Sequence, residues 1–188
     1  MPDANDLIDT VVSQYLKHFP DERGNLAGLI DQVVKGDELN NRKTFPGHAT
    51  GSGIVLSPDR KQLLLLEHKY LKVWLQPGGH WDPGEANPWE VARRETEEET
   101  GADIAERLDW ISNEPPLPID IDVQEIPANP VKEELDHYHY DFRYVFLAAS
   151  TEFASGAEYE AVDWFDFDEL PPQDFENVLD KLRRYQLI

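Results

Sequence analysis

The stretch GGHWDPGEANPWEVARRETEEETGA, residues 78–102, decides the fold of this chain. It joins a double glycine to a loop, an Asn-Pro helix start and a helix whose last turns are crowded with glutamates. Glu95 and Glu99 form a like-charge pair at i,i+4 spacing, and carboxylates near a helix C-terminus oppose the helix dipole. Because local energetics disfavour this cluster, the stretch indicates that Arg94 and one or more bound divalent cations neutralise it.

Three of the glutamates share one side of the predicted helix. Glu95, Glu98 and Glu99 stand at positions i, i+3 and i+4, so their side chains project together. Hard cations such as Mg²⁺ or Mn²⁺ bind a few carboxylates, retained waters and the phosphate oxygens of a substrate. The alternative is a solvated acidic face, which is the usual role of a charge run. The preceding glycine loop and the Arg94-Glu95 pair favour the metal site.

The start of this helix is predicted from residues 87–90. Asn87 fits an N-cap, Pro88 fits the first helical position, and Glu90 fits the reciprocal carboxylate of a capping box. The side opposite the glutamates carries Trp89, Ala92 and Thr96, which can pack on a sheet.

The full pattern resembles the signature of the Nudix hydrolase family. That box begins with glycine, reaches a glutamate six positions on, and closes as Arg-Glu-apolar-x-Glu-Glu-x-Gly-apolar. Here the matching box runs from Gly79 to Ala102, and the matched positions are Gly79, Glu85, Arg94, Glu95, Glu98, Glu99 and Gly101. So many fixed positions within one short stretch make a specific signal.

Two positions depart from the family pattern. Eight residues separate Glu85 from Arg94, where the family has seven, and Thr96 stands where the family usually has an aliphatic residue. We place the extra residue in the loop before Asn87, since the predicted cap fixes the helix start. This leaves the metal-binding face intact and puts only the role of Glu85 in question. We expect Thr96 to weaken packing slightly.

The resemblance implies an α/β fold, namely a Nudix-type α/β/α sandwich with a mixed β-sheet. It implies Mg²⁺- or Mn²⁺-dependent hydrolysis of a nucleoside diphosphate linked to another moiety, such as ADP-ribose or a nucleotide sugar. The implied metal ligands are Glu95, Glu98, Glu99 and a backbone carbonyl at Gly79, and the implied catalytic residues are Glu98, Arg94 and Glu85. The alternative function is a non-catalytic nucleotide-binding or regulatory module on the same fold.

The rest of the chain predicts an extension and one domain. Residues 1–45 carry two amphipathic helices, over 6–18 and 26–34, and Gly36 fits the stop of the second. We expect this extension to pack on the core or to mediate a homodimer. Residues 46–188 form the predicted Nudix domain, with strands expected over 49–56, 62–68, 73–75, 119–123, 137–149 and 160–165 and a closing helix over 175–185.

One predicted strand alternates ionisable and aromatic side chains. His137, His139, Asp141 and Arg143 point to one face. Two interpretations stay open: an edge strand with a wet side, or a substrate-facing row in which His137 or His139 contacts phosphate and Arg143 pairs with Asp141. We prefer the second. We also prefer it to a zinc site on the two histidines, because no third ligand has a motif-like spacing.

Three further residues are candidates near the substrate. Trp81 lies in the box loop, where it either stacks on a base or packs in the core. Glu158 and Glu160 precede a late apolar stretch, and either would supply an extra metal ligand or a general base if the resemblance extends to that loop.

The chain is polar and strongly acidic in composition. Its 38 Asp and Glu residues against 17 Lys and Arg residues give a formal net charge of −21. Because binding to nucleic acid polymers or anionic membranes depends on cationic side chains, we expect neither as a partner and expect a small-molecule diphosphate instead. The chain lacks cysteine, a secretory leader and any long apolar run, so we expect a cytoplasmic protein.

Overall fold

Helical elements open the chain, strands interrupted by one helix follow, and a helix comes last. The computed structural model describes residues 4–68, 72–128, 135–153, 159–170 and 172–188. The helical elements are α1 (Ala4–His18), η1 (Pro20–Arg23), α2 (Ala27–Lys35), α3 (Pro88–Thr100) and α4 (Pro172–Arg184). The strands are β1 (Gly47–Leu56), β2 (Gln62–His68), β3 (Trp74–Leu75), β4 (Gly78–His80), β5 (Ile104–Arg107), β6 (Asp120–Ile126), β7 (His137–Ala148) and β8 (Tyr159–Asp166).

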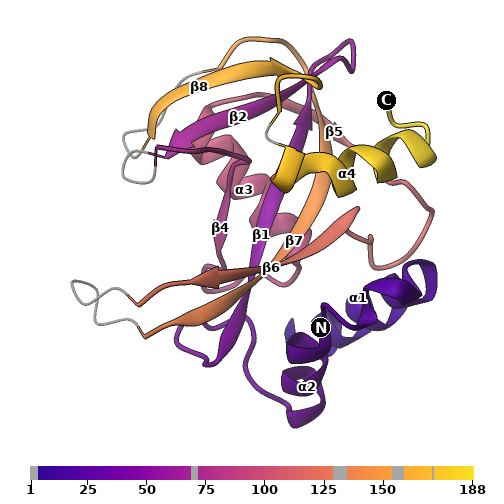
Figure 1. Ribbon diagram of the computed structural model, residues 1–188, viewed down its shortest axis with the longest axis vertical. Helices are drawn as coiled ribbons and strands as arrows, with labels where there is room; N and C mark the ends of the chain where they lie inside the picture. Colours follow the sequence, from indigo (N-terminus) through magenta and orange to yellow (C-terminus); the bar gives the residue numbers. More distant parts are fainter. Residues whose placement is uncertain (1–3, 69–71, 129–134, 154–158, 171) are drawn as a thin grey trace.

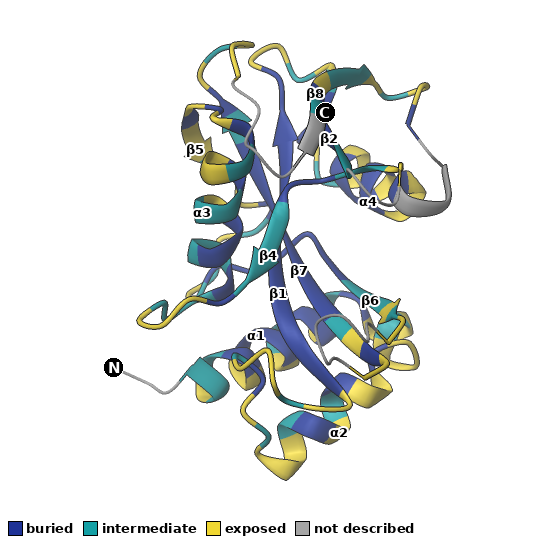
Figure 2. Cartoon of the chain, turned by 90° about the vertical axis from the view of Figure 1, so that its left-hand side faces the viewer, coloured by how far each residue is buried: buried dark blue, intermediate teal, exposed yellow. Residues whose placement is uncertain are grey.

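Two long strands form the centre of the sheet. β1 and β7 pair in parallel, from Gly47 opposite Tyr138 to Leu56 opposite Leu147. Every residue of β1 is buried, which is typical of parallel strands covered on both faces, and Figure 2 shows both strands in the buried interior. The alternative that residues 137–149 form an edge strand is therefore excluded, because β7 pairs with β1, β5 and β6.

The sheet is mixed, as predicted. Its order is β3-β2-β1-β7-β5, while β4 pairs with β1, β6 with β7 and β8 with β2. Apart from β1 with β7, these pairs are antiparallel. The predicted hairpin is confirmed, since β1 and β2 meet with Leu56 opposite Leu63.

Helices cover both faces of the sheet. α3 lies on one side of β1 and β7 and α4 lies on the other, as the two orthogonal views show (Figures 1 and 2). This arrangement confirms the predicted α/β/α sandwich. α3 turns its apolar stripe to the sheet, with Val91, Ala92 and Thr96 fully buried.

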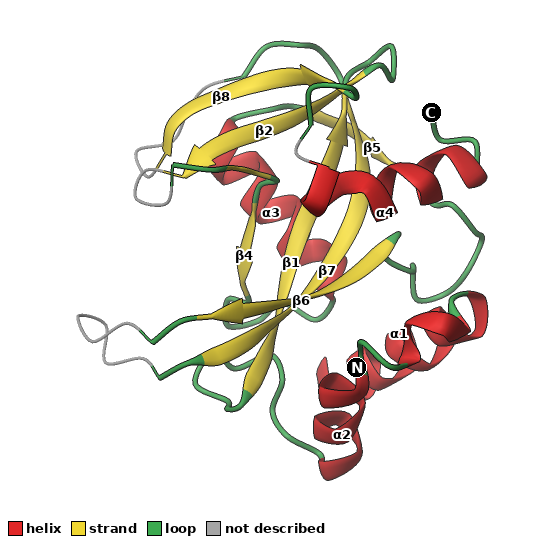
Figure 3. Ribbon diagram, in the orientation of Figure 1, coloured by secondary structure: helices red, strands yellow, loops and turns green. Residues whose placement is uncertain are grey.

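The N-terminal helices lie beside β6 and the first half of β7 (Figure 3). Tyr140 of β7 donates a hydrogen bond from its hydroxyl to Gln32 Oε1 of α2 at 2.7 Å. The Tyr15 hydroxyl of α1 accepts the backbone N–H of Ile121 at 3.3 Å. The division of the chain at residues 45 and 46 stays a prediction. No helix in the described ranges has the length and apolar character needed to cross a membrane.

The structure corrects the sequence analysis at two short strands and at one helix cap. β4 and β5 were not predicted, because three residues with two glycines and four residues with two charges carry no strand pattern. The predicted capping box at α3 is also wrong. The Asn87 side chain makes no cap hydrogen bond, and Glu90 accepts the N–H of Ala86 at 3.1 Å instead of that of Asn87.

Candidate active site

Glycines in β1 and β4 let these two strands and the start of α3 approach one another closely. β4 pairs with β1, with Gly51 opposite Gly79 and Ser52 opposite Gly78. A Cβ on Gly51 would lie 2.7 Å from the carbonyl oxygen of Pro88, so β1 and the start of α3 meet at a distance that only glycine allows. The helix that bears the glutamates is thereby held against β1, the strand that pairs with the box glycines of β4.

Two of the three glutamates reach β4 directly. Glu99 Oε2 accepts the backbone N–H of Gly78 at 2.9 Å. The Glu95 carboxyl group lies over Gly79, where a Cβ would come within 2.6 Å of it. Burial raises the pKa of Glu95, while the charge of Arg94 acts in the opposite direction. The glycine at position 79 therefore makes room for a carboxylate.

Arg94 joins the carboxylates to one another. Its Nε donates to Glu85 Oε1 at 2.8 Å and its Nη2 donates to Glu85 Oε2 at 3.2 Å. Nη1 lies 2.9 Å from Glu95 Oε1 and 3.0 Å from Glu98 Oε2. Nη2 also donates to the carbonyl oxygen of His80 at 2.8 Å. The hydrogen bonds to Glu85, foremost, raise the pKa of Arg94, so this residue is a fixed positive charge among three carboxylates.

The extra loop residue does not displace Glu85. α3 begins at Pro88 as predicted, and Glu85 reaches back from the loop to Arg94. Thr96, the other departure, is fully buried and donates its hydroxyl to the Ala92 carbonyl at 2.7 Å. The backbone bond satisfies the hydroxyl inside the apolar interface, which explains why α3 accommodates a threonine there.

We expect Arg94→Gln to lower the free energy of unfolding by about 1–3 kcal/mol, because Glu85, Glu95 and Glu98 would lose charged hydrogen bonds and repel one another. The matched control is Arg93→Gln, whose partner Glu97 forms an exposed pair, and we expect a change within about 0.5 kcal/mol. Urea unfolding measures both. If both substitutions changed the free energy of unfolding equally, the contacts of Arg94 would not stabilise the loop that carries Glu85.

Arg143 lies in a buried ion-pair network and not on an open face. Its guanidinium meets Asp120 at 3.3 Å, Asp122 at 2.7 Å and Asp141 at 3.3 Å, and its side chain is 5% exposed. The predicted pairing with Asp141 is present. Burial acts to lower the pKa of Arg143, but Asp141, Asp120 and Asp122 outweigh it and raise that pKa. Because three carboxylates already neutralise its charge, we do not propose Arg143 as a substrate-binding residue.

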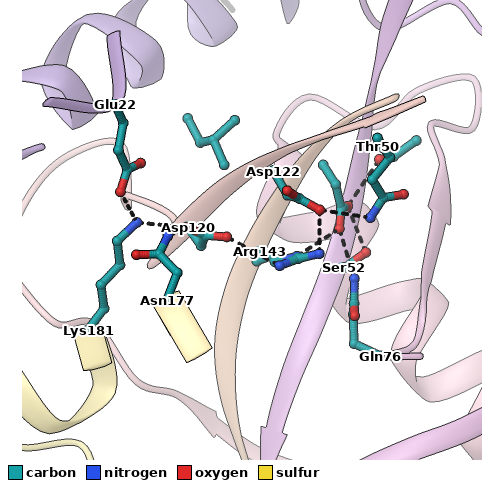
Figure 4. Close-up of polar contacts among 12 residues, drawn as sticks. Glu22, Thr50, Ser52, Gln76, Asp120, Asp122, Arg143, Asn177 and Lys181 are labelled. Atoms are coloured by element: carbon teal, nitrogen blue, oxygen red, sulfur yellow. Dashed lines mark hydrogen bonds and ion pairs between the residues drawn. The ribbon is translucent and has the colours of Figure 1, made fainter. Parts of the chain in front are cut away.

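The same network runs across the fold (Figure 4). At one end, Asp141 accepts hydrogen bonds from Thr50, Ser52 and Gln76, the last of which lies two residues before Gly78. At the other end, Asp120 pairs at 2.7 Å with Lys181 of α4, which in turn contacts Glu22 of η1. The network therefore connects the N-terminal region, α4 and the segment leading into the box.

The other predicted substrate residues lie at the ends of β4 and β7. His139 is half-buried and His137 is buried, and both join His48 and His80 in a histidine cluster. Trp81 is buried in the core, and its Nε1–H has no hydrogen-bond acceptor among the described residues. Glu158 lies outside the described residues, as does the side chain of Glu160, so both stay predictions.

Sequence reasoning missed His48 and His80. Each stands alone in the sequence, and only the pairing of β1 with β4 and β7 brings them to the other histidines. A cavity of about 510 Å³ lies elsewhere, between η1 and α4, and none of the predicted site residues lines it. The chemistry of the chain is therefore best sought at α3 and β4.

The comparisons with known proteins agree with this geometry. The family model for the NUDIX domain matches residues 47–186. A Lactococcus lactis protein named probable DHNTP pyrophosphohydrolase is 35% identical over 51% of this chain, which spans about half (51%) of that relative's length. The rat bis(5'-nucleosyl)-tetraphosphatase (asymmetrical) is 30% identical over 53% of this chain and 73% of its own length.

A solved structure supports the same fold. The crystal structure of a NUDIX family hydrolase from Clostridium perfringens has a TM-score of 0.54 and 22% identity, and covers 73% of this chain and 97% of that chain. At this identity the likeness concerns the fold alone. With the box on α3, the α/β/α sandwich and the match over residues 47–186, the chain belongs to the NUDIX family.

Proposed function

We propose that this protein is a Mg²⁺- or Mn²⁺-dependent pyrophosphohydrolase that cleaves the diphosphate bond of a nucleoside diphosphate linked to another moiety. The observation that carries the proposal is how α3 meets β4: Glu95 lies over Gly79, Glu99 accepts the N–H of Gly78, and Arg94 pairs with both Glu95 and Glu98. These carboxylates would repel one another without cations. The missing side chain of Gly79 leaves space for the Glu95 carboxyl group.

The donor atoms present fit a hard divalent cation. Carboxylate oxygens and backbone carbonyls are the ligands that Mg²⁺ and Mn²⁺ prefer, and the described residues offer both at α3 and β4. The Glu98 side chain is 61% exposed, so it faces solvent from which a hydrated ion and a phosphate can approach. Glu95, Glu98 and Glu99 would hold the metal, with a carbonyl of Gly79 assisting.

The chain's own residues would each have a defined task. A bound divalent cation would neutralise negative charge on the phosphate oxygens and lower the pKa of a coordinated water. Arg94 would keep the carboxylates of Glu95 and Glu98 in fixed positions, and Glu85 would in turn fix Arg94. We assign Glu98 to the reacting water as well as to the metal, because it is the exposed carboxylate of the set.

The substrate class follows from charge and from the relatives. A chain with net charge −21 repels anions, so a phosphate ester reaches this surface only with cations that screen it. The relatives are named for DHNTP and for bis(5'-nucleosyl) tetraphosphates, compounds that we add to ADP-ribose and nucleotide sugars as candidates. All of them contain a phosphoanhydride bond, which is the bond we propose the protein cleaves.

The test is a substrate panel followed by ³¹P NMR, recorded after each reaction is stopped with excess chelator so that Mn²⁺ does not broaden the phosphate resonances. The panel contains DHNTP, a bis(5'-nucleosyl) tetraphosphate, ADP-ribose, a nucleotide sugar and a nucleoside triphosphate, each with Mg²⁺, with Mn²⁺ and with a chelator. We expect new phosphate resonances from at least one compound, and only with a divalent cation. Calorimetric binding of a nucleotide without any product would instead support the regulatory module and contradict the proposal.

A further inference from the structure

Four imidazoles gather where β1, β4 and β7 meet. The ring of His48 lies 5.1 Å from that of His80, 5.0 Å from that of His137 and 4.8 Å from that of His139, measured between centroids. The nitrogens of His80 and His139 approach to 3.3 Å, and those of His137 and His139 to 3.2 Å. The Nudix box does not account for this cluster, since the carboxylates of the box belong to α3.

Strand register brings the rings to one face. His48 of β1 stands opposite His139 of β7, and residues paired across strands present their side chains on the same side. His80 of β4 stands opposite Thr50, two residues along β1 from His48, and therefore shares that side. Each ring is thus positioned by a backbone that the sheet already fixes.

The hydrogen bonds at the outer edges of the cluster select the tautomers. His48 Nδ1 lies 3.3 Å from the carbonyl oxygen of Thr44, and His137 Nδ1 lies 2.7 Å from that of Leu135. Because a carbonyl only accepts, Nδ1 carries the proton in both rings, so Nε2 is the ring nitrogen that His48 can offer to an ion. Metal-binding histidines are commonly oriented in this way, with one ring nitrogen bonded to a backbone carbonyl and the other directed at the ion.

The spacing suits tetrahedral coordination. His48, His80 and His139 each offer one nitrogen, and these nitrogens lie within 4.8 Å of one another. Zn–N bonds of about 2.0–2.1 Å at tetrahedral angles separate two ligand nitrogens by about 3.3–3.4 Å. The 3.3 Å between His80 Nε2 and His139 Nε2 already has this value, and rotations of the His48 ring would complete the set.

We propose that His48, His80 and His139 form a binding site for a borderline transition-metal ion such as Zn²⁺, with a fourth position open to water or to a substrate oxygen. Imidazole nitrogens favour Zn²⁺, Co²⁺ or Ni²⁺ over Mg²⁺, so this site differs in selectivity from the carboxylate face of α3. The sequence analysis did not find this set, because only His139 belongs to the row on β7, while His48 and His80 come from β1 and β4.

Such an ion would cross-link the strand that leads into the box. His80 is the last residue of β4, next to Gly79, and its carbonyl oxygen accepts from Arg94 at 2.8 Å. A metal bound to the His80 ring would therefore fix β4 against β1 and β7 and steady the acceptor that holds Arg94. The ion acts on the position of the box and needs no part in hydrolysis.

The test is cobalt spectroscopy on the chelator-treated, untagged full chain. Co²⁺ bound to nitrogens in a tetrahedral site absorbs strongly in the visible range, whereas octahedral Co²⁺ on carboxylates absorbs weakly. We expect a strong band that saturates at one ion per chain, that excess Zn²⁺ removes and that excess Mg²⁺ leaves unchanged. His80→Gln and His139→Gln should each abolish the band, and circular dichroism checks that both variants fold.

Two control variants separate this site from the box. His68→Gln removes a histidine outside the cluster, and Glu98→Gln changes the carboxylate face; both should keep the cobalt band. A chain that shows only weak octahedral absorption, or a band that Mg²⁺ displaces, would overturn the proposal. Loss of the band in Glu98→Gln would also overturn it, because the ion would then belong to the carboxylates.

Discussion

Glu98→Gln is expected to lower Mg²⁺-dependent turnover of the accepted diphosphate by several orders of magnitude. Loss of an outer-shell partner of a metal ligand typically costs about 10–100-fold, and Glu98 is proposed to touch both the metal and the reacting water, so its loss should cost more than that. The substitution keeps the shape of the side chain and removes its charge. Steady-state kinetics on the substrate found in the panel measure the effect.

The exposure of Glu98 makes this substitution a clean test. Its side chain is 61% exposed and contributes little to packing, so the variant should fold like the wild type. The matched control is Glu97→Gln on the neighbouring position of α3, where the carboxylate pairs with Arg93 away from the metal-binding face. We expect the control to retain turnover within a few-fold. Turnover that is equal in the two variants would contradict the assignment of Glu98.

Arg143→Met is expected to lower the free energy of unfolding by about 3–5 kcal/mol, the range for removing one partner of a buried ion pair. The side chains of Arg143, Asp120 and Asp141 are 5%, 5% and 2% exposed, so the substitution would leave two carboxylates in the interior without this cation. Asp120 keeps its contact with Lys181, which limits the loss. Urea unfolding followed by tryptophan fluorescence gives the difference.

The same substitution at an exposed arginine is the control. Arg183 pairs with Asp180 on the surface of α4, with side chains 57% and 71% exposed, and Arg183→Met should change stability by no more than about 0.5 kcal/mol. Adding Asp141→Asn to Arg143→Met should recover part of the loss, because it removes one of the stranded charges. Additive destabilisation in the double variant would show that the network is not held by charge.

The sequence sufficed for α3 and its glutamates because their pattern is local. The helix start at Pro88, the stop at Gly101 and the shared side of Glu95, Glu98 and Glu99 depend on spacing within one element. The hairpin of β1 and β2 and the helices α1 and α4 were equally accessible, since their apolar positions repeat with the period of a strand or a helix.

Contacts that depend on strand order could not be predicted. The partners of Arg143 come from β6 as well as β7, and Asp120 lies 23 residues away in sequence. The histidine cluster needs β1 opposite β7 in parallel and β4 beside β1, a topology that no local pattern specifies. In the sequence, the alternating ionisable residues of β7 were therefore compatible with a solvent-exposed strand face. In the structure, His137 and His139 contact other histidines and Arg143 is buried.

The N-cap of α3 was mispredicted because it depends on the conformation of the preceding loop, which residue types alone do not specify. Asn87 and Glu90 have the residue types of a capping box, but the loop before the helix carries an extra residue and presents Ala86 to the Glu90 carboxylate. The same loop directs Glu85 to Arg94, a contact that the family spacing alone would not have indicated.

The most direct test of the central claim is the position of a bound paramagnetic ion. Mn²⁺ broadens nearby amide resonances, and 188 residues are within reach of backbone assignment by NMR. In buffer with enough salt to screen the acidic surface, substoichiometric Mn²⁺ should first broaden the amides of Gly79, Glu95, Glu98 and Glu99. Broadening spread evenly over the acidic surface, or centred on a different part of the sheet, would contradict a cation site at α3 and β4.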